Sequence, residues 1–248
     1  MKRSQLNALA GVGILLSGLL FTSCKKSVFE NTQPETARVM AINLAPERMV
    51  AVGISGNLLG YAPLAFNSYT GGYLPVYPGE RTVGSYDHMT NDSLSEGKFN
   101  FEAKKYYSLF VVGSGNNYQN VIVHDNIDSL PAGSGQAFVR YINAINGSND
   151  PLVTISSNGT IVISENASFA AVSGFTAVTP GELTISLSEG NSINENRTIT
   201  VEAKKVYTIL LTSGATAGAD PQIKFIVNGI LEDAADQRNA SGRAVSIQ

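Results

Sequence analysis

The chain of 248 residues has a single cysteine, Cys24, no tryptophan and only two histidines, His88 and His124. One cysteine excludes a disulfide within the chain and leaves no Cys/His set for a zinc site. Two isolated histidines and the lack of a Gly-x-Ser-x-Gly segment do not favour a serine hydrolase. The sequence therefore predicts no catalytic residue, no metal site and no cofactor, and we expect a protein that is not an enzyme.

Carboxylates and glycines give no stronger enzymatic signal. Asp87, Asp92 and Glu96 fall in a predicted loop, where solvated acids are the default, so a carbohydrate-active enzyme is only a distant alternative. The segment 124–128, His-Asp-Asn-Ile-Asp, lacks the further oxygen ligands of a calcium loop. A Gly-rich phosphate loop between a strand and a helix is also missing.

Long apolar runs are absent except for one near the start of the chain. Residues 8–21 are almost wholly apolar and follow the basic pair Lys2 and Arg3. This stretch is shorter than the roughly 20 residues that a membrane-spanning helix needs. The pattern therefore predicts a cleaved signal peptide over residues 1–23.

The residues before the lone cysteine suggest why it is there. The segment 20–23, Leu-Phe-Thr-Ser, precedes Cys24 and resembles the lipobox of bacterial lipoproteins, in which the cysteine is acylated and becomes the new N-terminus. That resemblance implies a lipid bilayer as partner, bound through palmitate-type acyl chains on Cys24. The following residues, Lys25 and Lys26, are not the Asp of an inner-membrane retention signal. We expect a protein anchored in the outer membrane that faces the periplasm or the cell surface.

The charge balance excludes one class of partner. The formal net charge is −3, and loss of Lys2 and Arg3 with the signal peptide changes it to −5. An acidic chain is not expected to bind nucleic acid. Residues 24–36 are polar and without period, so they predict a lipidated N-terminus and a flexible tether.

A tandem repeat occupies the chain beyond the tether. Three blocks recur in order at offsets of 100 to 102 residues: Ala37–Asn43 as Ala137–Asn143, Gly72–Glu80 as Gly174–Glu182, and Glu102–Tyr107 as Glu202–Tyr207. A period of this length is that of a whole domain rather than of a solenoid unit. The repeat predicts two homologous domains, at 37–134 and 135–248.

The apolar residues within each repeat predict strands. Residues 98–103, 182–188 and 197–202 alternate with period two, as half-buried strands do. The runs 108–112, 121–123, 208–211 and 224–227 are continuous and β-branched or aromatic, which is typical of core strands. We therefore expect an all-β chain of two tandem immunoglobulin-like antiparallel β-sandwich domains. An extended pair would carry the second domain roughly 40 Å beyond the first.

Several blocks also resemble a known family. They are residues 37–39, 43–47, 73–79 and 125–133. In this order they are similar to domain-of-unknown-function family 4397, whose members are exported, repeated β-domains. The resemblance covers both repeats and implies a fold, but no chemistry.

Tyrosine is distributed unequally between the repeats. Eight of the ten tyrosines lie in the first, and Tyr69, Tyr77 and Tyr86 have no aromatic counterpart in the second. Aromatic residues that only one copy carries are candidates for a ligand surface, although core repacking is an equal alternative.

Two functions stay open at this point. One is a non-catalytic binding or adhesion module of the cell envelope that recognises a glycan or an envelope protein. The other is a purely structural envelope lipoprotein without a small ligand. Residues 241–245 near the end of the chain echo residues 134–138 at the start of the second repeat, and we expect residues 244–247 to form a short strand that caps the second domain.

Overall fold

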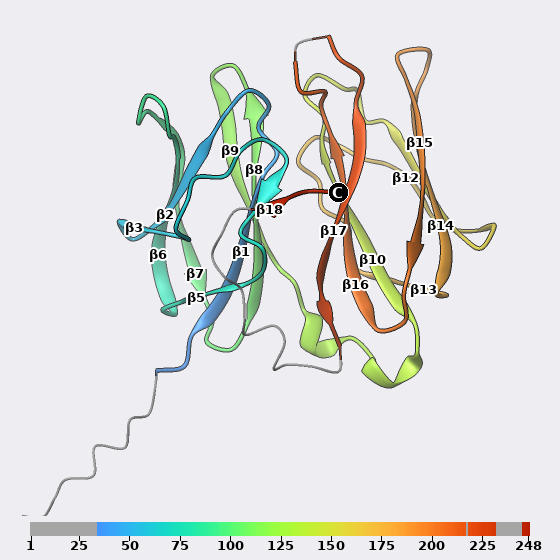
Figure 1. Cartoon of the computed structure of the whole chain (residues 1–248), viewed down its shortest axis with the longest axis horizontal. Helices are drawn as coiled ribbons and strands as arrows, with labels where there is room; N and C mark the ends of the chain where they lie inside the picture. The colour runs from blue at the N-terminus through green and yellow to red at the C-terminus, as the bar shows by residue number, and fades with distance from the viewer. Residues whose placement is uncertain (1–33, 217, 232–244) are drawn as a thin grey trace, which may run out of the picture. The chain divides into compact units, whose positions relative to one another are not determined.

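Short alternating or β-branched runs, separated by Gly, Pro, Asn and Ser clusters, form strands where the sequence predicts them. The computed structural model describes residues 34–216, 218–231 and 245–248, and its 58% strand and 3% helix confirm the all-β, β-sandwich prediction. The predictions for the signal peptide and for Cys24 lie outside these residues. Residues 35–248 form one unit, which is drawn in Figure 1.

The first repeat folds into two sheets. Outer sheet 1 has the strand order β3-β2-β6-β7, and inner sheet 1 has the order β18-β4-β1-β8-β9, with β5 also paired to β1. The strands are β1 (Ala37–Asn43), β2 (Val50–Ile54), β3 (Asn57–Leu58), β4 (Ser68–Tyr69), β5 (Leu74–Val76), β6 (Gly79–Asp87), β7 (Ser93–Phe101), β8 (Tyr106–Ser114) and β9 (Asn117–His124).

The second repeat has the same plan. Inner sheet 2 has the order β13-β10-β16-β17, and outer sheet 2 has the order β12-β11-β14-β15. The strands are β10 (Ala137–Ala144), β11 (Leu152–Ser157), β12 (Thr160–Asn166), β13 (Thr176–Val178), β14 (Gly181–Glu189), β15 (Ile193–Val201), β16 (Lys205–Thr212) and β17 (Gln222–Ile230). Two 3₁₀ turns, η1 (Ile127–Ser129) and η2 (Ala132–Ser134), connect the repeats.

The strand registers repeat with the sequence. β1 and β8 pair in parallel with Arg38 opposite Tyr106, and β10 and β16 pair in parallel with Phe138 opposite Val206. These parallel pairs depart from the antiparallel prediction; the other named pairs of the described strands are antiparallel. The offset between the two registers is the sequence period, so the repeated blocks specify the same pairing in each copy.

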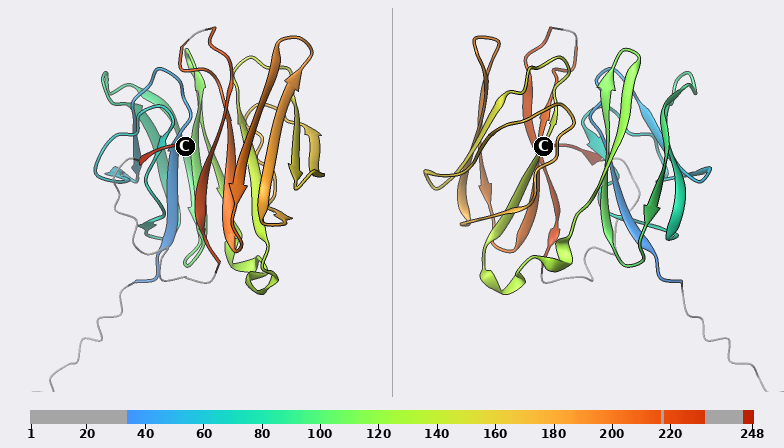
Figure 2. Two further views of the ribbon diagram at one scale, coloured as in Figure 1. Left: turned by 45° about the vertical axis from the view of Figure 1, so that its right-hand side comes forward. Right: turned by 180° about the vertical axis from the view of Figure 1, so that it is seen from behind.

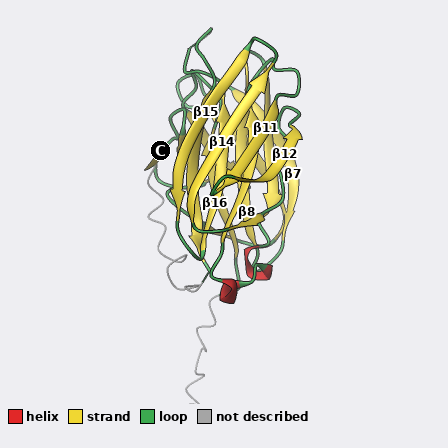
Figure 3. Cartoon of the chain, turned by 90° about the vertical axis from the view of Figure 1, so that its right-hand side faces the viewer, coloured by secondary structure: helices red, strands yellow, loops and turns green. Residues whose placement is uncertain are grey.

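The four sheets stack as four layers, in the order outer sheet 1, inner sheet 1, inner sheet 2 and outer sheet 2 (Figures 1 and 2). Each repeat has its own core between its outer and inner sheet. A third core lies between the two inner sheets and includes Met40 and Phe110 of the first repeat with Phe138 and Leu210 of the second. The repeats therefore pack side by side through this third core, rather than as an extended pair. Figure 3 looks onto outer sheet 2.

This stacking explains why some strands alternate and others do not. In β8, Leu109 and Val111 face the core of the first repeat, whereas Phe110 and Val112 face the core between the repeats. A strand that is buried on both faces needs apolar residues at every position. Strands of the outer sheets, such as β14, have one face toward solvent and keep the alternation.

A buried polar network crosses the core between the inner sheets. Arg140 of β10 forms an ion pair with Asp125, which follows β9, at 2.7 Å, and both side chains are at most 3% exposed. The guanidinium also donates to the hydroxyls of Ser108 and Thr208, at 2.9 and 3.0 Å, and stacks on Phe175, 4.4 Å from the ring centroid. Every nitrogen of Arg140 therefore has a partner, which a buried charge requires.

The same network includes Tyr73, whose hydroxyl donates to Asp125 and accepts from the side-chain amide of Asn228 at 3.2 Å. Burial, followed by the negative charge of Asp125, raises the pKa of Tyr73 well above its ordinary value. Tyr73 is therefore a neutral hydroxyl that links the two repeats.

The C-terminal strand differs from the prediction. β18 (Val245–Ser246) pairs with β4 of inner sheet 1, and Ile247 is buried in the core between the repeats. The last residue, Gln248, accepts a hydrogen bond from Phe225 on β17. A strand forms, but the expectation that it caps the second domain is wrong, because it extends a sheet of the first repeat. Packing of the repeats creates the apolar site that Ile247 fills.

Candidate binding cleft

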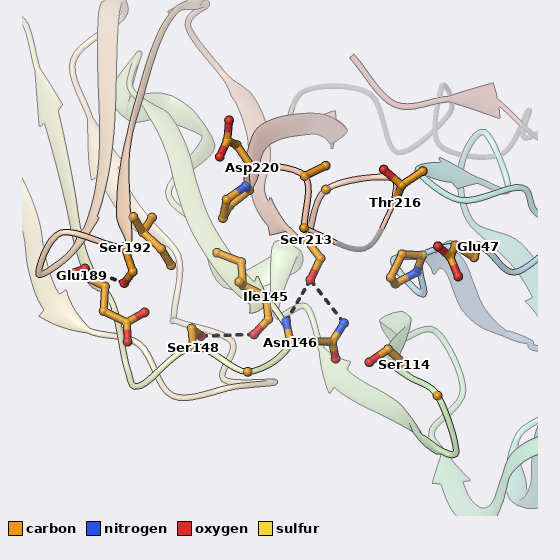
Figure 4. Close-up of a pocket in the computed structure, with 18 of the residues that line it drawn as sticks. Glu47, Ser114, Ile145, Asn146, Ser148, Glu189, Ser192, Ser213, Thr216 and Asp220 are labelled. Carbon is orange, nitrogen blue, oxygen red and sulfur yellow. Dashed lines mark hydrogen bonds between the residues drawn. The ribbon is translucent and has the colours of Figure 1, made fainter.

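Loops of both repeats line a cleft at one end of the four-layer unit. The cleft has a volume of about 640 Å³ and lies among the loops that follow β1, β8, β10, β14 and β16 (Figure 4). Cavities of this size are typical of small-molecule binding sites. β1 begins at Ala37 and runs toward the cleft, so the described chain starts at the opposite end of the unit (Figure 1).

Two equivalent asparagines direct the chain into the cleft. The side chain of Asn43, at the end of β1, accepts from the backbone of Ala45 and donates to Leu64. Asn143 in β10 makes the matching bonds to Ile145 and Ala167, at 3.0 and 2.8 Å. Both asparagines are fully buried, so each holds the first residues of its loop in place.

Hydrogen bonds order the middle of the cleft. The backbone and the side-chain amide of Asn146 both donate to the hydroxyl of Ser213, at 2.9 and 3.3 Å. In Figure 4 this pair lies between Glu189 on one side and Glu47 on the other. Glu189 itself accepts from the backbone of Asn149 at 2.7 Å. These bonds join the loops after β10, β14 and β16 into one wall.

Arg48 and Tyr118 form the wall on the side of the first repeat. The Nε of Arg48 donates to the Tyr118 hydroxyl at 2.9 Å, and Nη1 lies 3.0 Å from the carboxylate of Asp87. The bond to Tyr118 and the charge of Asp87 raise the pKa of Arg48 above its ordinary value. Asp87 is only 5% exposed, so the prediction that it belongs to a solvated turn is wrong.

The cleft can bind polar ligands through hydrogen bonds. Carboxylates line it at Glu47, Glu189 and Asp220, together with serine hydroxyls, asparagine amides and the single guanidinium of Arg48. Across the part of the chain that the structure describes, His, Cys, Asp and Glu do not gather in a set that could hold a metal ion. The side chains that line the cleft therefore offer hydrogen bonds, charges of both signs and the aromatic ring of Tyr118.

The family model for the domain of unknown function DUF4397 matches residues 37–146 and 141–245. The chain belongs to this family. The two matches confirm the resemblance that the sequence blocks indicated and confirm the tandem repeat. The domain boundary at residue 134 stays a prediction, since the two matches overlap beyond it.

Solved structures show distant likenesses to this DUF4397 chain. One is a family 26 carbohydrate-binding module from Eubacterium rectale in complex with maltoheptaose, with 10% identity, a TM-score of 0.24, and 75% of this chain and 95% of that chain covered. Another is a candidate cell adhesion protein from Bacteroides uniformis, with 12% identity and a TM-score of 0.23. The match covers 79% of this chain and 98% of that chain. Neither likeness is strong enough to assign a function. No curated protein matches the sequence significantly.

The DUF4397 chain does not bring its three candidate tyrosines together. Tyr69 lies on β4 and packs against the core between the repeats, where burial raises its pKa. Tyr77 lies in the turn after β5 and is 63% exposed. Tyr86 lies on β6, in the outer sheet, on the far side of the first repeat from that core. The tyrosines therefore occupy three separate places, and none of them lines the cleft.

The cleft residues were not among the predicted site residues. Glu47, Asn146 and Ser213 lie in polar turns, which sequence reasoning treats as solvated connections. One signal was present: Asn43 and Asn143 recur in both repeats at the end of an apolar run, and each makes the same bonds. Glu96, which the sequence analysis placed with Asp87 and Asp92 in a loop, lies on β7 instead.

Proposed function

We propose that this chain is a lipid-anchored, non-catalytic binding module of the bacterial cell envelope whose ligand, a glycan or an envelope protein, binds in the cleft between the repeats. The observation that carries the proposal is the cleft itself, built from loops of both repeats and ordered by bonds among Asn146, Ser213, Asn149 and Glu189. A preorganised site loses less conformational entropy when it binds.

Binding is favoured over catalysis by the partners of the cleft hydroxyls. Ser148 and Ser192 donate to backbone carbonyls, and Ser213 accepts from Asn146. A nucleophilic serine instead needs a general base within hydrogen-bond reach. These three hydroxyls therefore act as structural or ligand-binding groups.

The direction of β1 supports presentation of the cleft away from the membrane. The predicted tether enters the unit at the start of β1, whereas the cleft lies past its end. The predicted tether, 24–36, spans at most about 43 Å when fully extended. Acylation of Cys24 would place this tether at the outer membrane and leave the cleft open to periplasm or medium. Among residues 34–216, 218–231 and 245–248, no helix is long and apolar enough to cross a membrane.

Blocking variants test the cleft. Ser114→Trp and Asn149→Trp add bulk from the first and the second repeat, and Thr160→Trp, in the exposed hairpin at the other end of outer sheet 2, is the matched control. A glycan array and pull-downs from envelope extracts should show a ligand for wild type and Thr160→Trp but not for the blocked variants. If wild type binds nothing in either assay, the chain is a structural envelope lipoprotein instead.

Anchoring and exposure need their own experiment. Labelled palmitate should enter the wild-type chain and not Cys24→Ser. With the native cysteine acylated, a cysteine introduced at Asn149 is the free thiol for a membrane-impermeant maleimide. Labelling on intact cells means surface exposure, and labelling only after outer-membrane permeabilisation means a periplasmic orientation. Failure to label with palmitate would refute the lipid anchor.

A further inference from the structure

The outer face of outer sheet 1 carries a tyrosine ring that lies against two glycines. Gly53 on β2, Gly84 on β6 and Glu96 on β7 pair across the sheet in one row. A Cβ on Gly84 would lie 2.7 Å from Cζ of Tyr86, and one on Gly53 would lie 3.5 Å from Cε2. The ring therefore lies along the sheet over Gly84 and beside Gly53, and its hydroxyl donates to Glu96 at 2.8 Å.

Groups of two kinds flank this ring. Leu58 on β3 continues the row beyond Gly53 and is 70% exposed, so an aliphatic side chain stands on one side. On the other side, β7 carries Glu96 and Lys98, and Lys98 pairs with Glu80 at 2.8 Å on the exposed surface. An apolar surface with hydrogen-bonding groups at its border is typical of sites that orient a polar ligand.

The second repeat shows that the fold does not require this arrangement. Its equivalent row, read from the same strand pairing, is Ser164, Thr154, Ser186 and Asn196, and Ser188 stands where the first repeat has Tyr86. Outer sheet 2 forms with the same strand order and pairing without an aromatic ring on this row. The ring and the glycine beneath it are therefore a joint feature of the first repeat alone.

A second cavity adjoins the same strand. It has a volume of about 300 Å³ and is lined by Glu96 and Lys98, which border the ring, and by Asn120 on β9. The amide nitrogen of Asn120 donates to the carbonyl of Ser95, but its side-chain oxygen is buried with no hydrogen-bond partner among the described residues. A buried acceptor of this kind is uncommon, but it is closed to a sugar on the outer face, so this cavity is not part of the site inferred below.

We infer that this face, the Tyr86 platform (Leu58, Gly53, Gly84, Tyr86, Glu96 and Lys98), binds a pyranose unit of a glycan. The C–H face of the sugar ring packs on the tyrosine ring, as apolar groups pack on aromatic faces. Sugar hydroxyls donate to Glu96 and accept from Lys98. The inference rests on the proposed function in that the chain is a binding module, but it does not use the cleft.

The test is a titration of the full-length chain in detergent with four probes: maltoheptaose, cellohexaose, xylohexaose and N-acetylchitohexaose. Isothermal titration calorimetry measures each affinity, because the Tyr86 variants lack the tyrosine whose emission would respond to the ligand. Wild type and Tyr86→Phe should bind at least one probe. Tyr86→Ser, which copies Ser188, should weaken that binding at least about tenfold, since an aromatic contact contributes on this scale.

Controls separate the platform from the cleft and from misfolding. Gly84→Ser, which copies Ser186, should displace the ring and weaken binding as Tyr86→Ser does, with thermal unfolding recorded for both variants. Tyr77→Ser, an exposed tyrosine elsewhere, and the cleft variant Asn149→Trp should leave the affinity unchanged. Loss of binding in Asn149→Trp with none in Tyr86→Ser overturns the platform and retains the cleft. Binding of no probe by wild type also overturns it.

Discussion

Replacement of Arg140 by methionine should strongly destabilise the docking of the two repeats. Met40 occupies the equivalent position of the first repeat, so the substitution copies a residue that the fold already accepts there. It removes the ion pair with Asp125 and the bonds to Ser108 and Thr208. Asp125, only 1% exposed, then keeps hydroxyl donors from Tyr73 and Ser108 but loses its countercharge.

The expected cost follows from that burial. Removal of one partner of a buried ion pair costs about 3–5 kcal/mol, because the other charge stays desolvated. For a folded unit of this size, each kcal/mol corresponds to roughly 2–4 °C in Tm, so Arg140→Met should lower Tm by about 10 °C. The double variant Arg140→Met, Asp125→Asn removes both charges and should recover most of the loss.

Urea unfolding at pH 7, followed by circular dichroism and by tyrosine emission, measures Arg140→Met, Asp125→Asn and the double variant. Wild type should unfold in one transition on both probes, since the core between the inner sheets couples the repeats. A cost below about 1 kcal/mol for Arg140→Met, or a double variant as unstable as the sum of the two single variants, would show that the charges are not coupled as described.

Three further predictions concern the same unit. Because the pKa of Tyr73 is raised in the folded chain, its contribution to stability is complete below pH 10. Above pH 10 only the unfolded chain loses this proton, so the free energy of unfolding falls by up to about 1.4 kcal/mol per pH unit. In Tyr73→Phe the free energy of unfolding, measured against pH in this range, should have a slope smaller by one proton. Ile247→Ala should cost about 2–4 kcal/mol in urea, because Ile247 is 7% exposed, and an unchanged midpoint would mean that β18 is not docked in solution. Gly113→Ala should abolish stable folding at 37 °C, since the φ of Gly113 is 117° and a Cβ there would lie 2.8 Å from Cα of Tyr118. Gly97→Ala, with open space around the added Cβ, is the control, and a thermal scan should show only a small decrease in its Tm.

The fold was accessible from the sequence because its signals are local. Alternation marked β7, β14 and β15, and the block 102–107 recurs because it makes the same turn in each copy. In that turn Lys104 and Lys204 have φ of 64° and 65°, and the hydroxyls of Tyr107 and Tyr207 accept from the backbone of the residue five positions earlier. Such short-range requirements are visible in one sequence without any knowledge of packing.

The arrangement of the repeats could not be predicted in the same way. Continuous apolar runs in β8 and β16 indicated buried strands, but the same runs fit the core of a single sandwich. The position of Arg140, within a strand that is buried throughout, was the stronger sign, because a charge there needs a partner from elsewhere. That partner, Asp125, lies in a segment that the sequence indicated as part of the family resemblance and as a weak calcium loop, but not as the partner of a buried charge. Without the docked repeats, the loops of the cleft do not meet.

Hydrogen–deuterium exchange gives the most direct test of the cleft as the binding site. The full-length chain is compared with and without envelope polysaccharide and envelope protein fractions, and Ser114→Trp serves as the blocked control. Binding in the cleft predicts slower exchange of backbone amides in the loops after β10 and β14, at 145–149 and 189–193, in wild type alone. Protection confined to other strands, or equal protection in the blocked variant, would contradict it.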